Sequence, residues 1–263
     1  MSGSYAELAM YVAPEQVRAA NEQWLTRILE LLQQTRGDAS GLGSLELFRS
    51  PELLLSQTCG YPLLTQLQGQ VLLVGRPRYE WPDSSGGEHC SVIVSRATDP
   101  HTELADFKGC RAVINDWHSN SGMNLFRHRL APLQHGGRFF ASVASSGAHQ
   151  QSLRWVREGW ADLACIDSVT FAYLSHYAPA EVAGLRIVAR TASSPTLPYI
   201  TALSTGRDGA ERIREAMNTA LQQLPQVAAA LGLKEVLPAR EADYQKVLGY
   251  QQEAAEYGFE VLA

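Results

Sequence analysis

Small hydrogen-bonding side chains gather in residues 115–126, whose sequence is NDWHSNSGMNLF. Ser119, Asn120 and Ser121 place two hydroxyls and an amide just before a run that predicts a helix. The first turn of a helix offers backbone N–H groups without intrahelical partners and the positive end of the helix dipole. Together these groups could bind a small anion such as a phosphoryl group. The alternative is ordinary helix capping, for which Ser and Asn are favoured.

A histidine and an aspartate stand at two further turns of the same kind. His149 follows SSGA at the start of a predicted helix, where a bound anion would offset the repulsion between the helix dipole and a charged imidazole. Asp167 ends the apolar run ADLACI. Its carboxylate could accept the proton of a hydrogen phosphate or phosphonate, or pair with a ligand amine. It could also cap the next helix, and these roles are compatible.

Other turns add weaker candidates for ligand contact. Three of them are predicted in one turn of the first part of the chain: Thr58, Cys59 and Tyr61. Loop packing is the alternative for each. His118, with its neighbour Trp117, is a candidate for the wall of the site. Four further cationic or titratable residues are expected at the surface: His89, His101, Arg127 and Arg129.

Short apolar runs alternate with helical patterns along the chain, which predicts α/β sheets with parallel strands. In such sheets ligands bind beyond the carboxyl ends of the strands, where loops lead into helices. Four polar turns occupy positions of this kind: SQTCGYP, WHSNSG, SSGAH and the turn at residues 167–168. We therefore expect them to lie on one face and to form an anion site.

Composition excludes several classes of function. The 263 residues carry a formal net charge of −5, and the Lys and Arg residues form no basic stripe, so no nucleic-acid partner is expected. No apolar run is long enough to span a bilayer. The four cysteines match no zinc or redox spacing, and neither a metal nor a cofactor is expected.

Catalytic motifs are missing as well. The sequence contains no GxSxG, HExxH, P-loop or GxGxxG pattern. A triad could be drawn from Ser146, His149 and Asp167, but spacing alone supplies no geometry for a nucleophile and its base. We therefore assign no catalytic residue.

The order of these motifs resembles a known family. The segments LLLSQTCGYPL, LADFKGCRAVINDWHSNSGMNLFRHRL and SSGAHQQSLRWVREGWADLACIDSV are similar to the PhnD-like substrate-binding proteins of phosphate and phosphonate ABC transporters. The resemblance covers roughly residues 8–205. Each motif is moderately specific, whereas their combined order and spacing are more so.

The resemblance implies a two-lobed type II periplasmic-binding-protein-like fold, with a mostly parallel sheet in each lobe and a ligand cleft between the lobes. Lobe I would comprise residues 1–94 and 200–263, and lobe II residues 95–199, with hinge crossings near 91–97 and 196–202. The implied function is capture of phosphate or an organophosphonate for ABC-type uptake or sensing. Tyr11 follows the first predicted strand, where the family places an aromatic residue that contacts the ligand, and loop packing is the alternative for it. An ABC permease is the implied partner, and a monomer is expected.

Enzymes with a related fold give the alternative reading. Some cytoplasmic enzymes of menaquinone and thiamine-precursor pathways resemble type II binding proteins and act on small metabolites, and fold alone does not decide between the classes. The N-terminal sequence MSGSYAELAMYV has no basic n-region and no apolar h-region of a signal peptide. The family implies a periplasmic location, whereas this N-terminus leaves a cytoplasmic one open.

Overall fold

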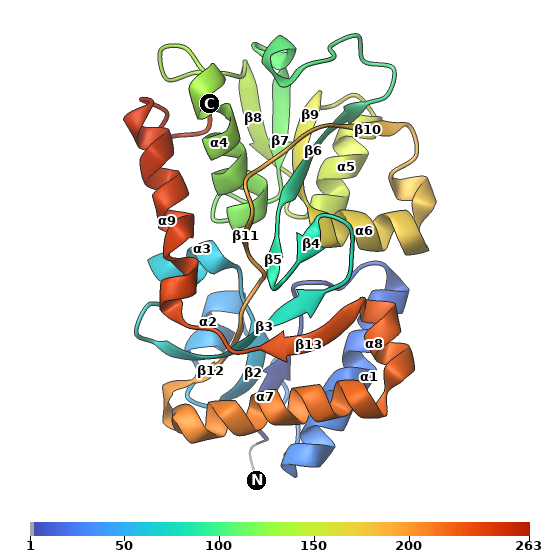
Figure 1. Cartoon of the computed structure of the whole chain (residues 1–263), viewed down its shortest axis with the longest axis vertical. Coiled ribbons are helices and arrows are strands. Elements are labelled where there is room, and N and C mark those ends of the chain that lie inside the picture. The colour runs from blue at the N-terminus through green and yellow to red at the C-terminus, as the bar shows by residue number, and fades with distance from the viewer. Residues whose placement is uncertain (1–2) are drawn as a thin grey trace. The chain divides into compact units, whose positions relative to one another are not determined.

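The structure is a computed structural model that describes residues 3–263 (Figure 1). The chain forms two compact units. Unit 1 contains the residues up to Trp81, together with Ser85–Gly87 and Pro195–Tyr244. Unit 2 contains Pro82–Ser84, Glu88–Ser194 and Gln245–Ala263.

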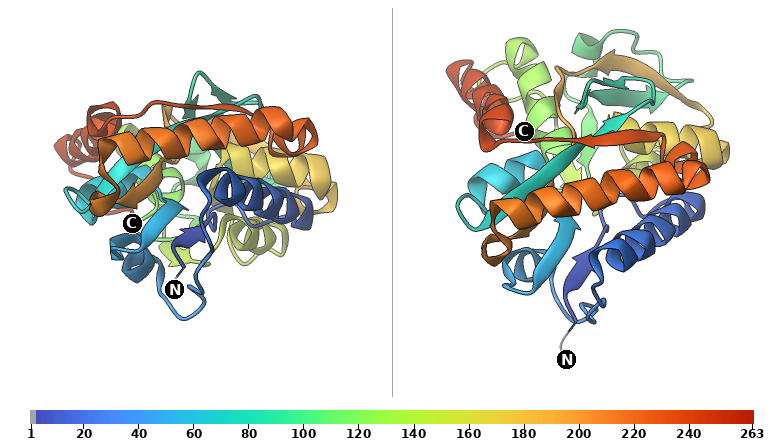
Figure 2. Two further views of the ribbon diagram at one scale, coloured as in Figure 1. Left: turned by 90° about the horizontal axis from the view of Figure 1, so that it is seen from below. Right: turned by 60° about the horizontal axis from the view of Figure 1, so that its bottom comes forward.

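Unit 1 is built on a five-stranded sheet. Its strand order is β1 (Tyr5–Glu7), β2 (Leu53–Gln57), β12 (Tyr199–Ala202), β3 (Val71–Tyr79) and β13 (Leu233–Leu237). Its helices are α1 (Glu15–Leu32), α2 (Ser44–Arg49), α3 (Gly60–Thr65), α7 (Gly206–Gln223) and α8 (Pro225–Leu231). Figure 2 shows α1 in blue and α7 in orange, and these two helices are in contact.

The sequence pattern of α1 explains that packing. Apolar residues recur at helical spacing, so Val17, Trp24 and Ile28 lie on one buried face. The Trp24 indole N–H donates to the Met217 carbonyl of α7, 3.1 Å away, which satisfies the one polar group of a fully buried ring. The helix ends at Gln33, whose backbone is left-handed with φ 54°.

Unit 2 contains a second five-stranded sheet. Its strand order is β10 (Leu185–Arg190), β6 (Ser91–Arg96), β9 (Leu163–Asp167), β7 (Arg111–Ile114) and β8 (Ser142–Ser145). Its helices are α4 (Leu125–Leu130), α5 (His149–Arg157), α6 (Ser168–Tyr177) and, from residue 245 onward, most of α9 (Glu241–Glu256). A smaller sheet has the order β11 (Ser194–Pro195), β5 (Glu88–His89) and β4 (Ser84–Ser85).

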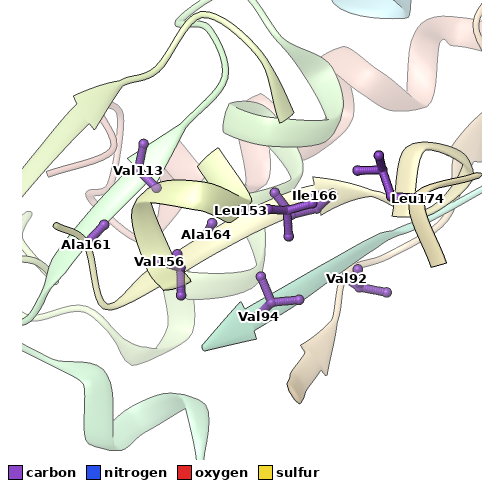
Figure 3. Close-up of a cluster of buried hydrophobic side chains, with 9 residues drawn as sticks. All are labelled: Val92, Val94, Val113, Leu153, Val156, Ala161, Ala164, Ile166 and Leu174. Carbon is purple, nitrogen blue, oxygen red and sulfur yellow. The ribbon is translucent and has the colours of Figure 1, made fainter. Parts of the chain in front are cut away.

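The core of unit 2 lies between its sheet and helix α5. Strands β6, β7 and β9 are nearly continuous apolar runs, as expected for strands buried on both faces. Figure 3 shows the resulting cluster of side chains from the sheet and its flanking helices: Val92, Val94, Val113, Leu153, Val156, Ala161, Ala164, Ile166 and Leu174. This packing gives the adjoining turns a rigid base.

The predicted α/β class is confirmed, but both sheets are mixed rather than mostly parallel. Strand β1 is parallel to β2, whereas β12 is antiparallel to both β2 and β3. In unit 2, β7 is parallel to β8 and β9, whereas β6 is antiparallel to β9 and β10. Strands β6 and β12 each follow a segment in which the chain passes from one unit to the other, and each is antiparallel to both of its neighbours in the sheet.

The two units differ from the expected lobes in two places. The chain first enters unit 2 at residues 82–88 rather than near 94, because β6 pairs with β9 and β10 of that unit. Residues 245–263 also belong to unit 2 rather than to the first lobe. They are attached there by hydrogen bonds from Asn124 to the Val247 carbonyl and from Arg127 to the Glu260 carbonyl.

No helix within residues 3–263 is both long enough and apolar enough to cross a membrane.

Candidate functional site

Three polar turns follow the parallel strands β7, β8 and β9 of unit 2. These strands are neighbours in the sheet, so their carboxyl ends meet at one edge. The turn after β7 leads into a π-helical turn (Asn120–Asn124) and α4, the turn after β8 into α5, and the turn after β9 into α6. The sequence prediction of polar turns before helix starts therefore holds for three turns of this unit.

The first turn combines capping with a close approach between backbone and side chain. Ser119 accepts a hydrogen bond from the Gly122 N–H at 3.0 Å, so it caps the helix as the alternative reading expected. A Cβ at residue 122 would lie 1.8 Å from Asn115 Oδ1, so any larger residue there would force the Asn115 side chain to move. The turn after β8 is tied to the same asparagine, because the Gly147 N–H donates to the Asn115 carbonyl at 2.9 Å.

Ser121 and His149 meet where the first two turns adjoin. Ser121 Oγ lies 3.1 Å from His149 Nε2. The Ser121 carbonyl accepts from Ser91 Oγ of β6 at 2.9 Å and from Cys165 Sγ of β9 at 3.2 Å. The backbone of Ser121 is therefore held by two strands while its hydroxyl faces the imidazole.

Burial keeps His149 neutral at physiological pH. Loss of hydration lowers the pKa of His149 from 6.5 to about 4, although the Asp167 carboxylate acts to raise it, and the charge of His89 adds to the lowering. A neutral imidazole still donates one hydrogen bond and accepts another. His149 thus offers the site a hydrogen-bonding group without a fixed positive charge.

This pKa predicts how stability depends on pH. Because the folded protein resists protonation of His149, stability is fully present above pH 6.5 and is lost as the pH falls from 6.5 to about 4. His149→Gln removes the titrating group. We expect the free energy of unfolding of wild type, relative to that of the variant, to fall by up to about 3 kcal/mol between pH 7 and pH 4. Urea titrations at several pH values measure this difference, and a constant difference would contradict the assignment.

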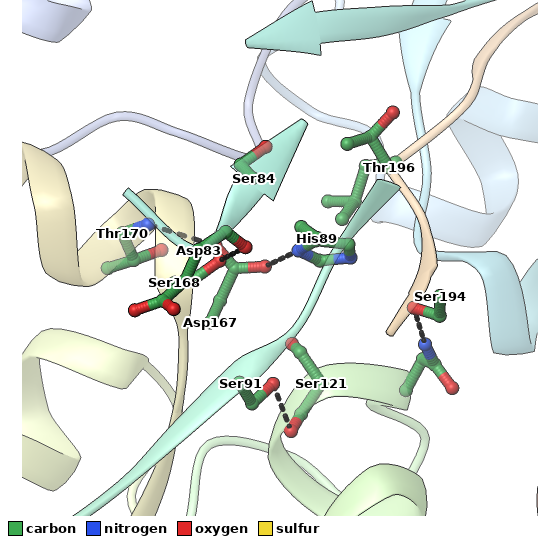
Figure 4. A network of polar contacts seen from close by, with 12 residues as sticks. Asp83, Ser84, His89, Ser91, Ser121, Asp167, Ser168, Thr170, Ser194 and Thr196 are labelled. Carbon is green, nitrogen blue, oxygen red and sulfur yellow. Dashed lines mark hydrogen bonds and ion pairs between the residues drawn. The ribbon is translucent and has the colours of Figure 1, made fainter. Parts of the chain in front are cut away.

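Asp167 is buried, and its two carboxylate oxygens contact Thr170 and His89 of unit 2. Its Oδ1 accepts from the Thr170 N–H at 2.9 Å, so the carboxylate caps α6 as the sequence suggested. Its Oδ2 lies 2.9 Å from Nδ1 of His89, and the two side chains are only 3% and 1% exposed (Figure 4). Burial acts to raise the pKa of Asp167, but the charge and hydrogen bond of His89 and the further interactions with His149 and Thr170 outweigh it and lower the pKa.

The expected surface position of His89 was wrong. No local signal in the sequence marks this residue. Its burial depends on the pairing of β6, the strand that follows it, with β9, which begins more than seventy residues later. Arg127 is also buried, where it donates to the Glu260 carbonyl and to Asn124 Oδ1 instead of facing solvent. Arg129 and His101 are half-buried.

Asn120 connects the polar cluster to Ser194 and Asn124. Its Nδ2 donates to Ser194 Oγ at 2.9 Å, and its Oδ1 accepts from Asn124 Nδ2 at 3.1 Å. His118, by contrast, is exposed, and its backbone N–H donates to Asp116 Oδ1 at 2.6 Å. Ser119, Asn120, Ser121, His149 and Asp167 thus belong to one cluster, whereas the side chain of His118 lies at the surface.

The comparisons with known proteins bear on this geometry. A family model described as ABC transporter, phosphonate, periplasmic substrate-binding protein matches residues 51–244, which is most of the chain. The chain belongs to this family. It is therefore a solute-binding protein of the kind that takes up small oxyanions. A comparison with curated protein sequences gives no match.

Several solved structures share the fold. A binding protein component of an ABC phosphonate transporter from Pseudomonas aeruginosa aligns with a TM-score of 0.79 at 11% identity, covering 98% of this chain and 87% of that one. PhnD1 from Prochlorococcus marinus in complex with methylphosphonate gives 0.72 at 12% identity, covering 92% and 94%. A Xanthomonas citri protein bound to ATP gives 0.66 at 16% identity, covering 94% and 95%. The phosphonate-binding family member described here thus has the type II periplasmic-binding-protein fold.

Unit 1 of this solute-binding protein carries the second group of candidates. Tyr11 follows β1, and Thr58 follows its parallel neighbour β2, so both turns lie at one sheet edge. Thr58 is 1% exposed, and its Oγ1 makes no hydrogen bond in the described chain, although its N–H donates to the Pro198 carbonyl. Tyr11 packs edge-on against Tyr79, with ring centroids 6.1 Å apart. Cys59 precedes α3 and is half-buried, as is Tyr61 within that helix.

The triad drawn from the sequence does not form. Ser146 Oγ bonds to the Ala148 carbonyl at 3.0 Å and lies 2.7 Å from Ser152 Oγ. The hydroxyl nearest His149 Nε2 belongs to Ser121 instead, and the carboxylate of Asp167 faces His89. Within residues 3–263, no group of three His, Cys, Asp or Glu side chains is arranged to hold a metal ion.

Proposed function

We propose that this protein binds phosphate or a small organophosphonate through the cluster at the carboxyl edge of β7, β8 and β9. The observation that supports this most directly is the meeting of Ser121 and His149, at 3.1 Å, between two helix starts. A tetrahedral oxyanion has several acceptor oxygens and no donor when fully ionised. Hydroxyls, an imidazole N–H and backbone N–H groups at helix starts match that pattern.

The proposed ligand is held largely by neutral donors. His149 is neutral in the unliganded protein, and the nearby Arg127 is engaged with the Glu260 carbonyl and Asn124. Neutral donors need no counter-charge to remain buried when the site is empty, yet each hydrogen bond to an ionised ligand contributes about 1.5–3 kcal/mol. Several such bonds support micromolar or tighter binding. A bound dianion would also raise the proton affinity of His149, which strengthens the interaction at lower pH.

Four residues of unit 1 remain proposed ligand contacts: Tyr11, Thr58, Cys59 and Tyr61. Thr58 is the best supported of the four, because a buried hydroxyl without a hydrogen-bond partner costs stability unless a ligand supplies that partner. His118 is retained as a proposed contact of weaker support, since its side chain is exposed. We further propose that the protein acts as a monomer and delivers its ligand to an ABC permease.

The proposed role is capture without chemical change. Ser146 Oγ bonds to the Ala148 carbonyl and to Ser152 Oγ, whereas His149 Nε2 contacts Ser121 Oγ. The absence of a bond between Ser146 and His149 among these contacts supports binding over hydrolysis. Incubation with methylphosphonate, followed by phosphorus NMR of the released ligand, distinguishes the two roles. Recovery of unchanged ligand supports capture, whereas a new phosphorus signal that depends on the protein would establish the enzyme alternative.

Ligand-dependent stability tests the proposal itself. A ligand that binds only the folded state stabilises by about 2.7 kcal/mol at a concentration 100-fold above its Kd. For a chain of this size we expect methylphosphonate or phosphate to raise the melting temperature by about 5 °C or more under that condition. Sodium chloride at equal ionic strength is the control for salt. The absence of a shift with any phosphorus oxyanion would contradict the proposal.

A further inference from the structure

The buried carboxylate of Asp167 is engaged on both oxygens by groups of unit 2. Oδ1 accepts from the Thr170 N–H, and Oδ2 lies 2.9 Å from His89 Nδ1. Figure 4 shows His89 pointing from β5 toward this carboxylate. The pair is nearly sealed from solvent, with side-chain exposures of 1% for His89 and 3% for Asp167.

This pair lies beside the proposed oxyanion site. Asp167 is the register partner of Ser91 across β9 and β6, and Ser91 Oγ donates to the Ser121 carbonyl at 2.9 Å. Asp167 also interacts electrostatically with His149. A carboxylate at this position would repel an oxyanion unless a positive group or a proton compensated it. In this chain the imidazole of His89 lies against that carboxylate, with Nδ1 2.9 Å from Oδ2.

We propose that His89 determines ligand specificity by occupying Asp167, so that the site accepts phosphorus oxyanions whose substituent is small and uncharged and discriminates against those that carry an ammonium group. This inference rests on the proposed function. An ammonium-bearing ligand could use Asp167 only by displacing the imidazole from a buried pair. Without that displacement its ammonium group would lose water and gain no partner, which is costly in a buried site.

Matched ligand pairs isolate the effect of charge. Ethylphosphonate and aminomethylphosphonate have nearly the same shape, as do n-propylphosphonate and 2-aminoethylphosphonate, and within each pair a methyl group replaces an ammonium group. We expect titration calorimetry of wild type at pH 8 to give at least 10-fold tighter binding for the uncharged member of each pair. Equal or tighter binding of the ammonium member would overturn the inference.

Two variants test whether His89 causes the preference. His89→Ala frees the carboxylate and leaves space, so the ratio of affinities within each pair should shift at least 10-fold toward the ammonium member. His89→Asn keeps an N–H donor near the position of Nδ1 and should retain the wild-type preference. A ratio in His89→Ala that equals wild type would overturn the role of His89. If His89→Ala does not fold, the wild-type comparison of the ligand pairs still tests the predicted preference against the ammonium group.

The outcomes separate this inference from the proposed function. If methylphosphonate binds and the ammonium members bind best, the specificity inference fails while the oxyanion site stands. If methylphosphonate binds but all four longer ligands are rejected, size rather than charge decides, and the inference also fails. If neither methylphosphonate nor phosphate binds wild type, both fail.

Discussion

Replacing Ser121 and His149 together by alanine should weaken binding of methylphosphonate about 1,000-fold. The substitutions remove two groups that would each donate a hydrogen bond to an ionised ligand, and two such bonds contribute about 4 kcal/mol between them. In the free protein these two side chains bond to each other, so the double variant leaves neither one without its partner. Titration calorimetry with wild type and variant measures the change.

A matched control uses residues of the same types in the same unit. Ser175 and His176 are adjacent exposed residues of α6, and their replacement by alanine should leave the affinity within about twofold of wild type. Comparable affinities for wild type and for the Ser121→Ala, His149→Ala protein would show that the ligand binds elsewhere. Weakening by the control variant to the same degree would point to a general loss of structure.

Asp167→Asn should lower the free energy of unfolding by about 3–5 kcal/mol. Asparagine is as good a helix cap as aspartate, so the bond from the Thr170 N–H can persist. What the variant removes is the negative charge opposite His89, in a pair whose side chains are almost completely buried. Breaking such a pair removes the charged acceptor and leaves a desolvated imidazole without its partner. Urea denaturation at pH 7 measures the loss.

The exposed pair between His128 and Glu253 provides the control. Its atoms are 2.7 Å apart, but the glutamate side chain is 57% exposed, so Glu253→Gln should cost no more than about 1 kcal/mol. A loss for Asp167→Asn as small as that of the control would mean that the buried pair does not stabilise unit 2. In that case the losses caused by Asp167→Asn and His89→Asn should simply add in the double variant.

Part of this site could be predicted from the sequence because its signals are local. Polar turns that follow apolar strands and precede helices identified Ser119–Ser121, His149 and Asp167, and the parallel arrangement of β7, β8 and β9 brings their ends together. The capping of α6 by Asp167 was also readable, since an N-cap acts within three residues of itself.

The rest depends on contacts between distant segments, which single-sequence patterns do not encode. His89 reaches Asp167 only because β6, the strand that follows it, pairs with β9 in a register that sets Ser91 opposite Asp167. Arg127 is buried because residues near 260 supply a carbonyl acceptor. The antiparallel directions of β6 and β12 likewise depend on where the chain passes from one unit to the other, and not on the composition of the strands.

The interlocking of Asn115 with its neighbours affects how binding energy is distributed. Its side-chain oxygen occupies the space above Gly122, and its carbonyl accepts bonds from the Gly147 N–H and from Ser145 Oγ. A displacement of one turn therefore moves the other, and substitutions in the two turns should show epistasis. Affinity is in this sense a cooperative property of the joined turns. The loss of affinity measured for a substitution in one turn will depend on whether the other turn has already been changed.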